Sequence, residues 1–291
     1  GFTITSGHYN TTTTTRGAGV FKENTVTTLE LKNNTITNNV AQFDGAISAL
    51  FPDVGTTILE IDNCTIKNNF SKGRTAFNIG FNYTANNSVS GTLNAFITNS
   101  VIENNFASDI NNYKGTSAVA GAFTGISLAN KIVNASVINC TITNNTDNGT
   151  DTSIVNPALI TGGGKVKFYL YNSIVWNNSI TRTFTRNTSV AGFISCQDVI
   201  RFENNITEDD LSTICNGAIL ANNSNTNPLF TNSINDFNLQ LGSPAIDGGD
   251  NTFVNSSEDI LQNDRIYNGT VDIGAYESSF GPNNNSLTLN I

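Results

Sequence analysis

The sequence predicts an all-β fold, a parallel β-helix whose coils stack one above another. The composition favours strands and turns, because charged residues make up only 13% and the polar share is filled by Asn, Thr, Ser and 24 Gly. A nine-residue phrase recurs along the chain, and every copy ends with a pair of asparagines. The interval between copies varies, whereas helical solenoids keep a steadier period and need helix-forming residues.

The charge balance and the hydropathy exclude two classes of partner. The net charge is −9, so a nucleic-acid partner is not expected, since phosphate binding needs a basic face. No apolar run approaches the roughly 18 residues of a membrane helix, so no membrane span is predicted. The sequence has no Met and no signal peptide, which indicates a mature or trimmed piece of a longer protein.

Five copies of the phrase align by hand. They are LKNNTITNN (31–39), IDNCTIKNN (61–69), ITNSVIENN (97–105), VINCTITNN (137–145) and LYNSIVWNN (170–178). Each has an apolar anchor, and the anchors are Ile36, Ile66, Ile102, Ile142 and Val175. A sixth, degraded copy is IRFENNIT (200–207). We therefore expect one coil per copy, with the extra length placed in loops between copies.

A bend is predicted inside each copy. Leu31 and Ile36 are an odd number of residues apart, so both cannot face inward from one flat strand. One asparagine lies three residues before each anchor and occupies this bend: Asn33, Asn63, Asn99, Asn139 and Asn172. Asparagine tolerates the left-handed backbone of a tight bend, and its amide can donate along a stack. The second pair, such as Asn38–Asn39, is predicted to close the next corner.

Small-residue segments follow the copies and predict a further strand in each coil. They are DGAISAL (44–50), TAFNIGF (75–81), TSAVAGAF (116–123), TGGG (161–164) and SVAGFIS (189–195). Small side chains suit strands whose backbones lie close to other parts of the molecule.

The four cysteines fall into two pairs. Cys64 and Cys140 share a repeat position two coils apart, about 9.6 Å from the strand spacing, which exceeds the disulfide limit of roughly 7 Å. We therefore expect two buried free thiols. Cys196 and Cys215 bracket an acidic loop, where we expect a disulfide and hence an oxidising, extracytoplasmic setting.

The residue after each anchor is predicted to point outward. These residues are Thr37, Lys67, Glu103, Thr143 and Trp176. Lys67 and Glu103 lie on adjacent coils, so we expect an ion pair worth a few tenths of a kcal/mol. Trp176 is predicted to be exposed, where its indole could stack on a sugar ring, unless a long loop covers it.

The C-terminal part reads differently from the coils. Its phrases are NPLFTNSINDFNLQLGSPAIDGGD (227–250) and DILQNDRIYNGTVDIGAYES (259–278). With the coils, they closely resemble the choice-of-anchor Q surface proteins of Bacteroidota, within the pectate-lyase-like superfamily. The resemblance implies a right-handed parallel β-helix that is exported and held at the cell surface, associated with the outer membrane. Relatives often carry a further sorting domain for type IX secretion.

Three segments are expected from this reading: coils over 1–222, a C-terminal cap over 223–278, and a tail or linker over 279–291. The cap is predicted to cover the apolar end of the last coil. Arg265 is predicted to pin the cap by pairing with Asp272 or Asp259. The alternative is a calcium site, since Ca²⁺ takes carboxylate oxygens; its ligands would be Asp247, Asp250, Asp259 and Asp272. No other cofactor is expected.

Catalytic residues are not assigned. A polysaccharide lyase of this fold needs a basic Lys or Arg beside a charge neutraliser, yet the 14 Lys and Arg are scattered. The lone His8 is not followed by Gly, as hydrolases of this fold would require. No Ser-His-Asp set or metal-binding Cys/His spacing is present. The sequence leans against an enzyme without excluding one.

The expected function is an extracellular scaffold or adhesin that presents loops to a glycan or a cell-envelope protein. The favoured loops are 70–94, 106–130 and 146–165, and the favoured contacts are Trp176, Tyr83 and Tyr113. One alternative is a polysaccharide lyase or glycoside hydrolase, which should show Lys or Arg beside clustered acids on one face. Another is a self-associating subunit of a surface filament or secretion-associated complex.

Overall fold

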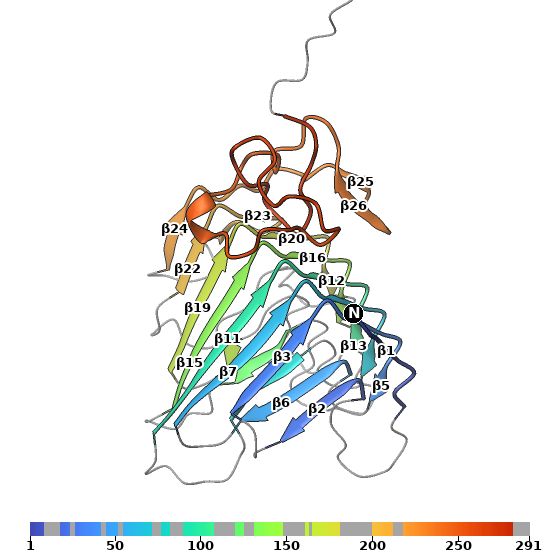
Figure 1. Cartoon of the computed structure of the whole chain (residues 1–291), viewed down its shortest axis with the longest axis vertical. Helices are drawn as coiled ribbons and strands as arrows, with labels where there is room; N and C mark the ends of the chain where they lie inside the picture. Colours follow the sequence, from blue (N-terminus) through green and yellow to red (C-terminus); the bar gives the residue numbers. More distant parts are fainter. Residues whose placement is uncertain are drawn as a thin grey trace, which may run out of the picture.

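The chain folds as a β-solenoid of parallel strands with almost no helix, which confirms the predicted fold class. The structure is a computed structural model. It describes residues 1–8, 18–23, 27–41, 45–51, 55–71, 77–81, 90–107, 120–124, 131–147, 161–162, 165–180, 200–211 and 218–281. Figure 1 shows the strands stacked side by side along the molecule, with the C-terminal residues gathered at one side of the stack.

Each complete coil contributes one strand to each of four parallel sheets. The long sheet has seven strands: β3 (Thr28–Lys32), β7 (Gly55–Asp62), β11 (Gly91–Thr98), β15 (Lys131–Ile138), β19 (Lys165–Tyr171), β22 (Ile200–Glu203) and β24 (Ile219–Ala221). The middle sheet follows it: β1 (Thr3–Thr5), β4 (Thr35–Thr37), β8 (Thr65–Lys67), β12 (Val101–Glu103), β16 (Thr141–Thr143), β20 (Ile174–Trp176) and β23 (Ile206–Thr207).

The other two sheets complete the coil. The short sheet contains β5 (Val40–Ala41), β9 (Phe70–Ser71), β13 (Phe106–Ala107), β17 (Thr146–Asp147) and β21 (Ser179–Ile180). The small-residue sheet contains β2 (Val20–Glu23), β6 (Ile47–Phe51), β10 (Phe77–Phe81), β14 (Ala120–Thr124) and β18 (Thr161–Gly162). The predicted small-residue strands are thus confirmed, apart from 189–195, which lies outside the described residues.

The paired asparagines form the corners between sheets, as predicted. Asn33, Asn63, Asn99, Asn139 and Asn172 all have φ between 46° and 57°, in the left-handed region. Asn63 and Asn99 lie on consecutive layers, since the Asn63 amide donates to Thr98 O at 3.2 Å. Asn204 and Asn222 adopt the same conformation, so the degraded sixth copy and a seventh at 221–224 turn the same corner.

The second corner contains a buried ladder of amides. Its members are Asn39, Asn69, Asn105, Asn145 and Asn178. The side-chain nitrogen of each of the first four donates to the side-chain oxygen on the next layer, over distances of 2.9 to 3.0 Å. Asn105 Nδ2 also donates to Ile66 O at 3.0 Å, and Asn105 N donates to Asn145 Oδ1 at 3.0 Å. The ladder satisfies corner backbone groups that no strand partner reaches.

The core consists of stacked columns of identical or similar side chains. The anchors Ile36, Ile66, Ile102 and Ile142 are at most 1% exposed and pair layer by layer in the middle sheet. Leu31 and its equivalents on the long sheet face them in one apolar cluster. The core is therefore continuous from coil to coil rather than divided into separate domains.

Cys64 and Cys140 are buried free thiols, as predicted. Their backbone amides donate to the hydroxyls of Ser100 and Ser173 on the next layer, at 3.0 and 3.1 Å. Burial raises the pKa of Cys64 to about 11 and that of Cys140 to about 12, so neither forms a thiolate at neutral pH. Cys196 and Cys215, the predicted disulfide, lie outside the described residues.

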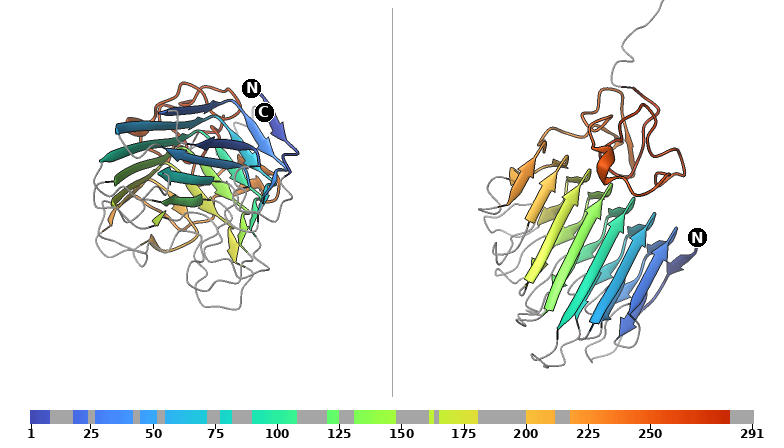
Figure 2. Two further views of the ribbon diagram at one scale, coloured as in Figure 1. Left: turned by 90° about the horizontal axis from the view of Figure 1, so that it is seen from below. Right: turned by 60° about the vertical axis from the view of Figure 1, so that its left-hand side comes forward.

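The C-terminal block, residues 227–281, contains the hairpin β25 (Phe230–Asn232) and β26 (Asp236–Leu239) and a 3-10 turn at Asn251–Phe253. The prediction that it covers the end of the last coil is wrong. It packs across the outer face of the middle sheet, with Val101, Ile174 and Ile206 in its apolar cluster. Figure 2 shows it beside the strand ends of several coils. The middle sheet already presented apolar side chains outward, so this lateral face needed a cover.

The predicted outward column is less exposed than expected. Thr143 is fully buried, and Thr37 and Glu103 are each 8% exposed. Lys67 remains half-buried and pairs with Glu103, with 3.7 Å between Nζ and Oε1, as predicted. Beside Thr143, Asn144 Nδ2 donates to Ser233 O of the block at 2.7 Å, which shows how closely the block approaches this column.

Candidate functional site

A groove lies where the outer face of the long sheet meets the C-terminal block. Its walls are Lys32, Glu60, Asp62, Phe96 and Thr98 from β3, β7 and β11, with Asn255 from the block, and its volume is about 330 Å³. The five coil residues reach one face because they occupy alternate positions on three neighbouring strands. The groove is thus built on rigid strands and closed on one side by a loop.

The groove carries one cation among several carboxylates. Lys32 Nζ lies 3.0 Å from Glu60 Oε2 and 3.8 Å from Glu30 Oε2. A hydrogen bond to Glu60 and the charge of that carboxylate raise the pKa of Lys32, so the ammonium stays protonated at neutral pH. Thr98 Oγ1 donates to Asp62 Oδ1 at 2.6 Å. The site therefore offers fixed donors and acceptors on adjacent layers.

Aromatic side chains extend this face toward the later coils. Phe96 is 39% exposed in the groove. On β19, Tyr169 and Tyr171 stack with ring centroids 6.0 Å apart, and Tyr171 stacks on Phe253 of the block at 4.0 Å. Two residues before Phe96 on the same face, Asn94 Oδ1 accepts from Asn134 Nδ2 of the next strand at 2.8 Å. Apolar rings alternating with amides and carboxylates give a surface that suits polar ligands with apolar faces.

Of the three predicted ligand-binding residues, the structure describes only Trp176. Trp176 is only partly exposed and packs against the apolar cluster of the C-terminal block, so the prediction of a freely exposed indole is wrong. Tyr83 and Tyr113 lie outside the described residues, as do most of the loops expected to carry binding. The residues of the groove were not singled out from the sequence.

The four predicted calcium ligands do not form a metal site. Among the described residues, no group of three or more His, Cys, Asp or Glu is placed to hold a metal ion. Asp259 and Asp272 accept hydrogen bonds from backbone amides, at 2.7 to 2.9 Å. Asp250 accepts from Thr252 N at 2.8 Å and caps the 3-10 turn, which lowers its pKa. Asp247 alone keeps two buried carboxylate oxygens without a hydrogen-bond partner in the described chain.

Arg265 is the centre of a buried cluster of charged residues in the C-terminal block. The cluster, called the knot below, consists of Arg265, Asp259, Asp272 and Glu277. Arg265 Nη2 donates to the carbonyls of Asp272 and Gly274 at 2.9 and 2.7 Å and lies 3.9 Å from Glu277 Oε2. The prediction that Arg265 pins the block agrees with this position. Its direct contacts, however, are two carbonyls and Glu277 rather than the carboxylates of Asp272 or Asp259.

Burial shifts the acids of the knot toward their neutral forms. Desolvation raises the pKa of Asp272 to about 6 and that of Glu277 to about 7. Arg265 and the backbone amides oppose this shift without cancelling it. Buried carboxylates with raised pKa values also occur in active sites. Here their oxygens accept from backbone amides, as Glu277 does from Tyr267 N and Asp272 N, which indicates a structural role.

One signal in the sequence could have indicated the groove. Residues one and three positions before each corner asparagine face outward from the long sheet, such as Lys32 and Glu30 before Asn33. Across the copies these positions combine opposite charges with Phe96. Their significance depends on Asn255, which is far away in sequence and reaches the groove only because the block folds back onto the coils.

Comparison of the chain with protein-family models, with curated proteins and with solved structures finds no match. The parallel β-helix therefore rests on the structure itself, and the family suggested by the C-terminal phrases is not identified. In the part of the chain that is described, no helix is long and apolar enough to cross a membrane.

Proposed function

We propose that the protein is a non-catalytic, cell-surface β-helix of the choice-of-anchor Q type that binds a glycan along the groove of the long sheet. The observation that carries this proposal is the groove itself. An exposed ring, Phe96, lies beside hydroxyl and carboxylate groups held on rigid neighbouring strands and beside the amide of Asn255 in the block. Sugar rings present apolar C–H faces and polar edges, which such a surface complements.

The rigidity of the frame supports a scaffold role. The groove residues are fixed by the strand register and by contacts between layers, such as Thr98 with Asp62 and Lys32 with Glu60. Binding to a preformed surface loses little conformational entropy. An exported, surface-held location follows from the resemblance of the C-terminal phrases and remains part of the proposal.

A polysaccharide lyase or hydrolase is the second candidate. Lys32 beside Glu30, Glu60 and Asp62 is the arrangement of a cation among clustered acids on one face that such an enzyme should show. Against it, a general base must be unprotonated, and the neighbouring carboxylates raise the pKa of Lys32. We therefore favour glycan binding over catalysis as the function of the groove.

A glycan array followed by titration of the bound glycans tests the proposal. Phe96→Ala and Glu60→Gln should weaken binding at least fivefold, because each removes a contact from the groove. Lys67→Ala, on the middle sheet, is the control and should bind normally. Turnover is measured in parallel as new reducing ends or unsaturated products. No binding by the wild type would overturn the proposal, and sustained turnover abolished by Lys32→Ala would establish the enzyme instead.

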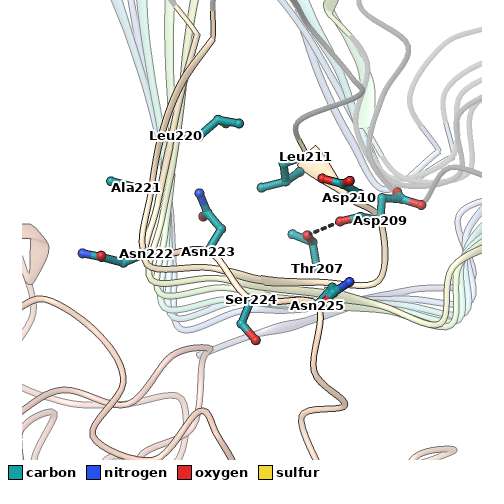
Figure 3. A pocket seen from close by; sticks show the side chains of 10 residues that line it. All are labelled: Thr207, Asp209, Asp210, Leu211, Leu220, Ala221, Asn222, Asn223, Ser224 and Asn225. Atoms are coloured by element: carbon teal, nitrogen blue, oxygen red, sulfur yellow. Dashed lines mark hydrogen bonds between the residues drawn. The ribbon is translucent and has the colours of Figure 1, made fainter.

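The expected self-association has one supporting observation at the end of the stack. In the described chain, β24 is an edge strand of the long sheet, and Ile219 and Leu220 are 45% and 38% exposed. A hollow of about 420 Å³ lies at this end. Figure 3 shows Leu220, Asn223 and Leu211 among the side chains that line it. Sedimentation of native protein, with Leu220→Ser as the variant, tests association through this end; a monomer at all concentrations would exclude it.

A further inference from the structure

A second pocket lies in the C-terminal block, away from the groove. Its volume is about 560 Å³, and it is formed by the β25–β26 hairpin together with the segments around Tyr267 and Phe280. None of its lining residues belongs to the coils. A ligand in this pocket would therefore touch neither the long sheet nor the groove on which the proposed function depends.

The pocket has an exposed aromatic rim. Tyr267 is 58% exposed and Phe280 is 41% exposed. The two segments are tied together, since Asn268 Nδ2 donates to Phe280 O at 3.1 Å and Tyr267 N donates to Glu277 Oε1 at 3.1 Å. Exposing two rings to water is unfavourable for the folded protein alone, which makes them candidates for ligand contact.

Apart from the buried Leu239, the remaining lining is polar, and part of it is bonded to the acids around Arg265. Asn238 comes from β26, Asn263 donates to Asp259 Oδ2 at 3.2 Å, and Ser278 N donates to Asp272 Oδ2 at 2.7 Å. These side chains offer amide and hydroxyl groups that match hydroxyl donors and acceptors of a ligand. Because bonds to Asp259 and Asp272 hold Asn263 and Ser278, and Asp236 holds Asn238 within the hairpin, the pocket is largely preformed.

The charge of the lining decides which polar ligand fits. Asp264, which is exposed, and Glu277, which is buried at the side of the pocket, are its ionisable acids, and no Lys, Arg or His lines it. An anionic ligand would meet repulsion and no compensating cation. A small ammonium ion would leave most of the volume and the amides unused. A neutral saccharide uses the rings, the amides and the carboxylate of Asp264 together.

We propose that this pocket is a second binding site, which takes a neutral saccharide. Tyr267 and Phe280 stack on its apolar faces, and Asp264 and Asn238 bond its hydroxyls. Uronates and sulfated sugars are excluded by the acidic lining. This inference does not rest on the function proposed for the groove.

The test is a ligand-observed NMR titration of the full chain with neutral and acidic oligosaccharides. Tyr267→Ala and Phe280→Ala should each weaken binding of neutral sugars about five- to tenfold, as expected for loss of one aromatic contact. Tyr267→Phe and Phe280→Tyr keep the rings and should retain binding. Leu261→Ala, also exposed in the block but outside the pocket, controls for general surface effects.

Two further comparisons separate this site from the groove. Asp264→Asn keeps the shape of the side chain and should admit uronates that the wild type rejects, because it removes the exposed negative charge. Phe96→Ala, in the groove, should leave the neutral-sugar titration of the pocket unchanged. The inference is overturned if neutral sugars do not bind, if they bind equally to Tyr267→Ala and Phe280→Ala, or if acidic sugars bind as well as neutral ones.

Discussion

The coils and the C-terminal block satisfy their buried polar groups in opposite ways. In the coils, neutral amides do so repeatedly: Asn69 N donates to Asn105 Oδ1 at 3.1 Å, and each layer repeats this bond. In the block, single charged groups do so: Asp259 Oδ1 accepts from Leu261 N and Asn263 N at 2.9 and 2.8 Å. Buried charges cost far more to desolvate than amides, so the acids of the block need Arg265, whereas the amide ladder needs no ion.

The two regions join through corner asparagines. Asn172 Nδ2 donates to Asp250 O at 2.9 Å, and Asp250 N donates to Asn172 Oδ1 at 2.9 Å. In the first coils, the corresponding amide of Asn63 donates instead to Asn33 Oδ1 at 2.7 Å. The side chain of the same corner residue thus bonds to the preceding layer early in the chain and to the block later. Because every coil has this corner asparagine, the coils that lie beside the block have a side-chain amide with which to bond it.

The largest predicted effect comes from removing the one cation of the block. Arg265→Ala leaves Glu277, Asp259 and Asp272 without their compensating charge and should lower the free energy of unfolding by about 3–5 kcal/mol. Chemical denaturation measures this change. Arg201→Ala, whose side chain is 41% exposed and pairs with Glu203, is the control and should cost less than about 1 kcal/mol. Similar losses for both would contradict a charged knot.

Breaking the amide ladder should rank next. Asn105→Ala removes two donors and two acceptor contacts from a fully buried position, leaving partners on both neighbouring layers unsatisfied. We expect a loss of about 3 kcal/mol, measured by chemical denaturation. Asn104→Gly is the matched control, because φ at Asn104 is 53° and glycine adopts this conformation freely. If the two variants were equally stable, the ladder would not hold the coils.

The contact between block and coils should depend on Gly274. Its φ is 107°, and a Cβ there would lie 2.9 Å from Ile174 Cδ1 and 3.0 Å from Thr141 Oγ1. Gly274→Ala should therefore lower the free energy of unfolding by about 2–3 kcal/mol. Gly269→Ala shares a positive φ of 91° but meets no atom within 4 Å, so it isolates the backbone part of the effect. Equal losses would show that close packing at Gly274 contributes nothing.

The acids of the knot predict a pH dependence that the coils should not share. Desolvation raises the folded-state pKa of Asp272 to about 6 and of Glu277 to about 7, above their ordinary values. A raised pKa means that the folded state holds these protons more tightly than the unfolded chain. The stabilisation is therefore complete below about pH 4 and is lost as the pH rises through 7.

We expect the contribution of these two groups to fall between pH 4 and 8 by a few kcal/mol, at most about 3 kcal/mol for each group, since each pKa is raised by about two to three units. Denaturation of the wild type and of Glu277→Gln across this range measures it, and the variant should show the shallower slope above pH 5. A steeper slope in the variant, or parallel curves, would show that Glu277 does not titrate in this range.

The coils could be predicted from the sequence because their information is local and repeated. Every copy of the phrase has an asparagine at the same corner, so the conformation expected at Asn33 is also expected at Asn63. The odd number of residues from Leu31 to Ile36 requires a bend between two sheets. The register of the stack follows once the copies are aligned. Cys64 and Cys140 are placed correctly for the same reason.

The position of the block and the groove could not be predicted, because both depend on contacts between distant residues. The apolar residues of the block indicate that it covers something, and the end of the last coil is one plausible target. Yet Val101, Ile174 and Ile206 present a second apolar surface, outward from the middle sheet. The block packs on the middle sheet, where Gly274 fits closely against Ile174. No local pattern in the sequence indicates this contact between distant residues.

The smallest predicted effect concerns a charged pair in the coils and sharpens the contrast with Arg265. Lys67 Nζ lies 3.7 Å from Glu103 Oε1, and the lysine side chain is 39% exposed. Desolvation raises the pKa of Glu103, and Lys67 opposes that shift. A double-mutant cycle with Lys67→Ala and Glu103→Gln should give a coupling energy below about 1 kcal/mol, because water and salt screen the pair. A coupling as large as the loss expected for Arg265→Ala would mean that the coils, too, rely on buried charge.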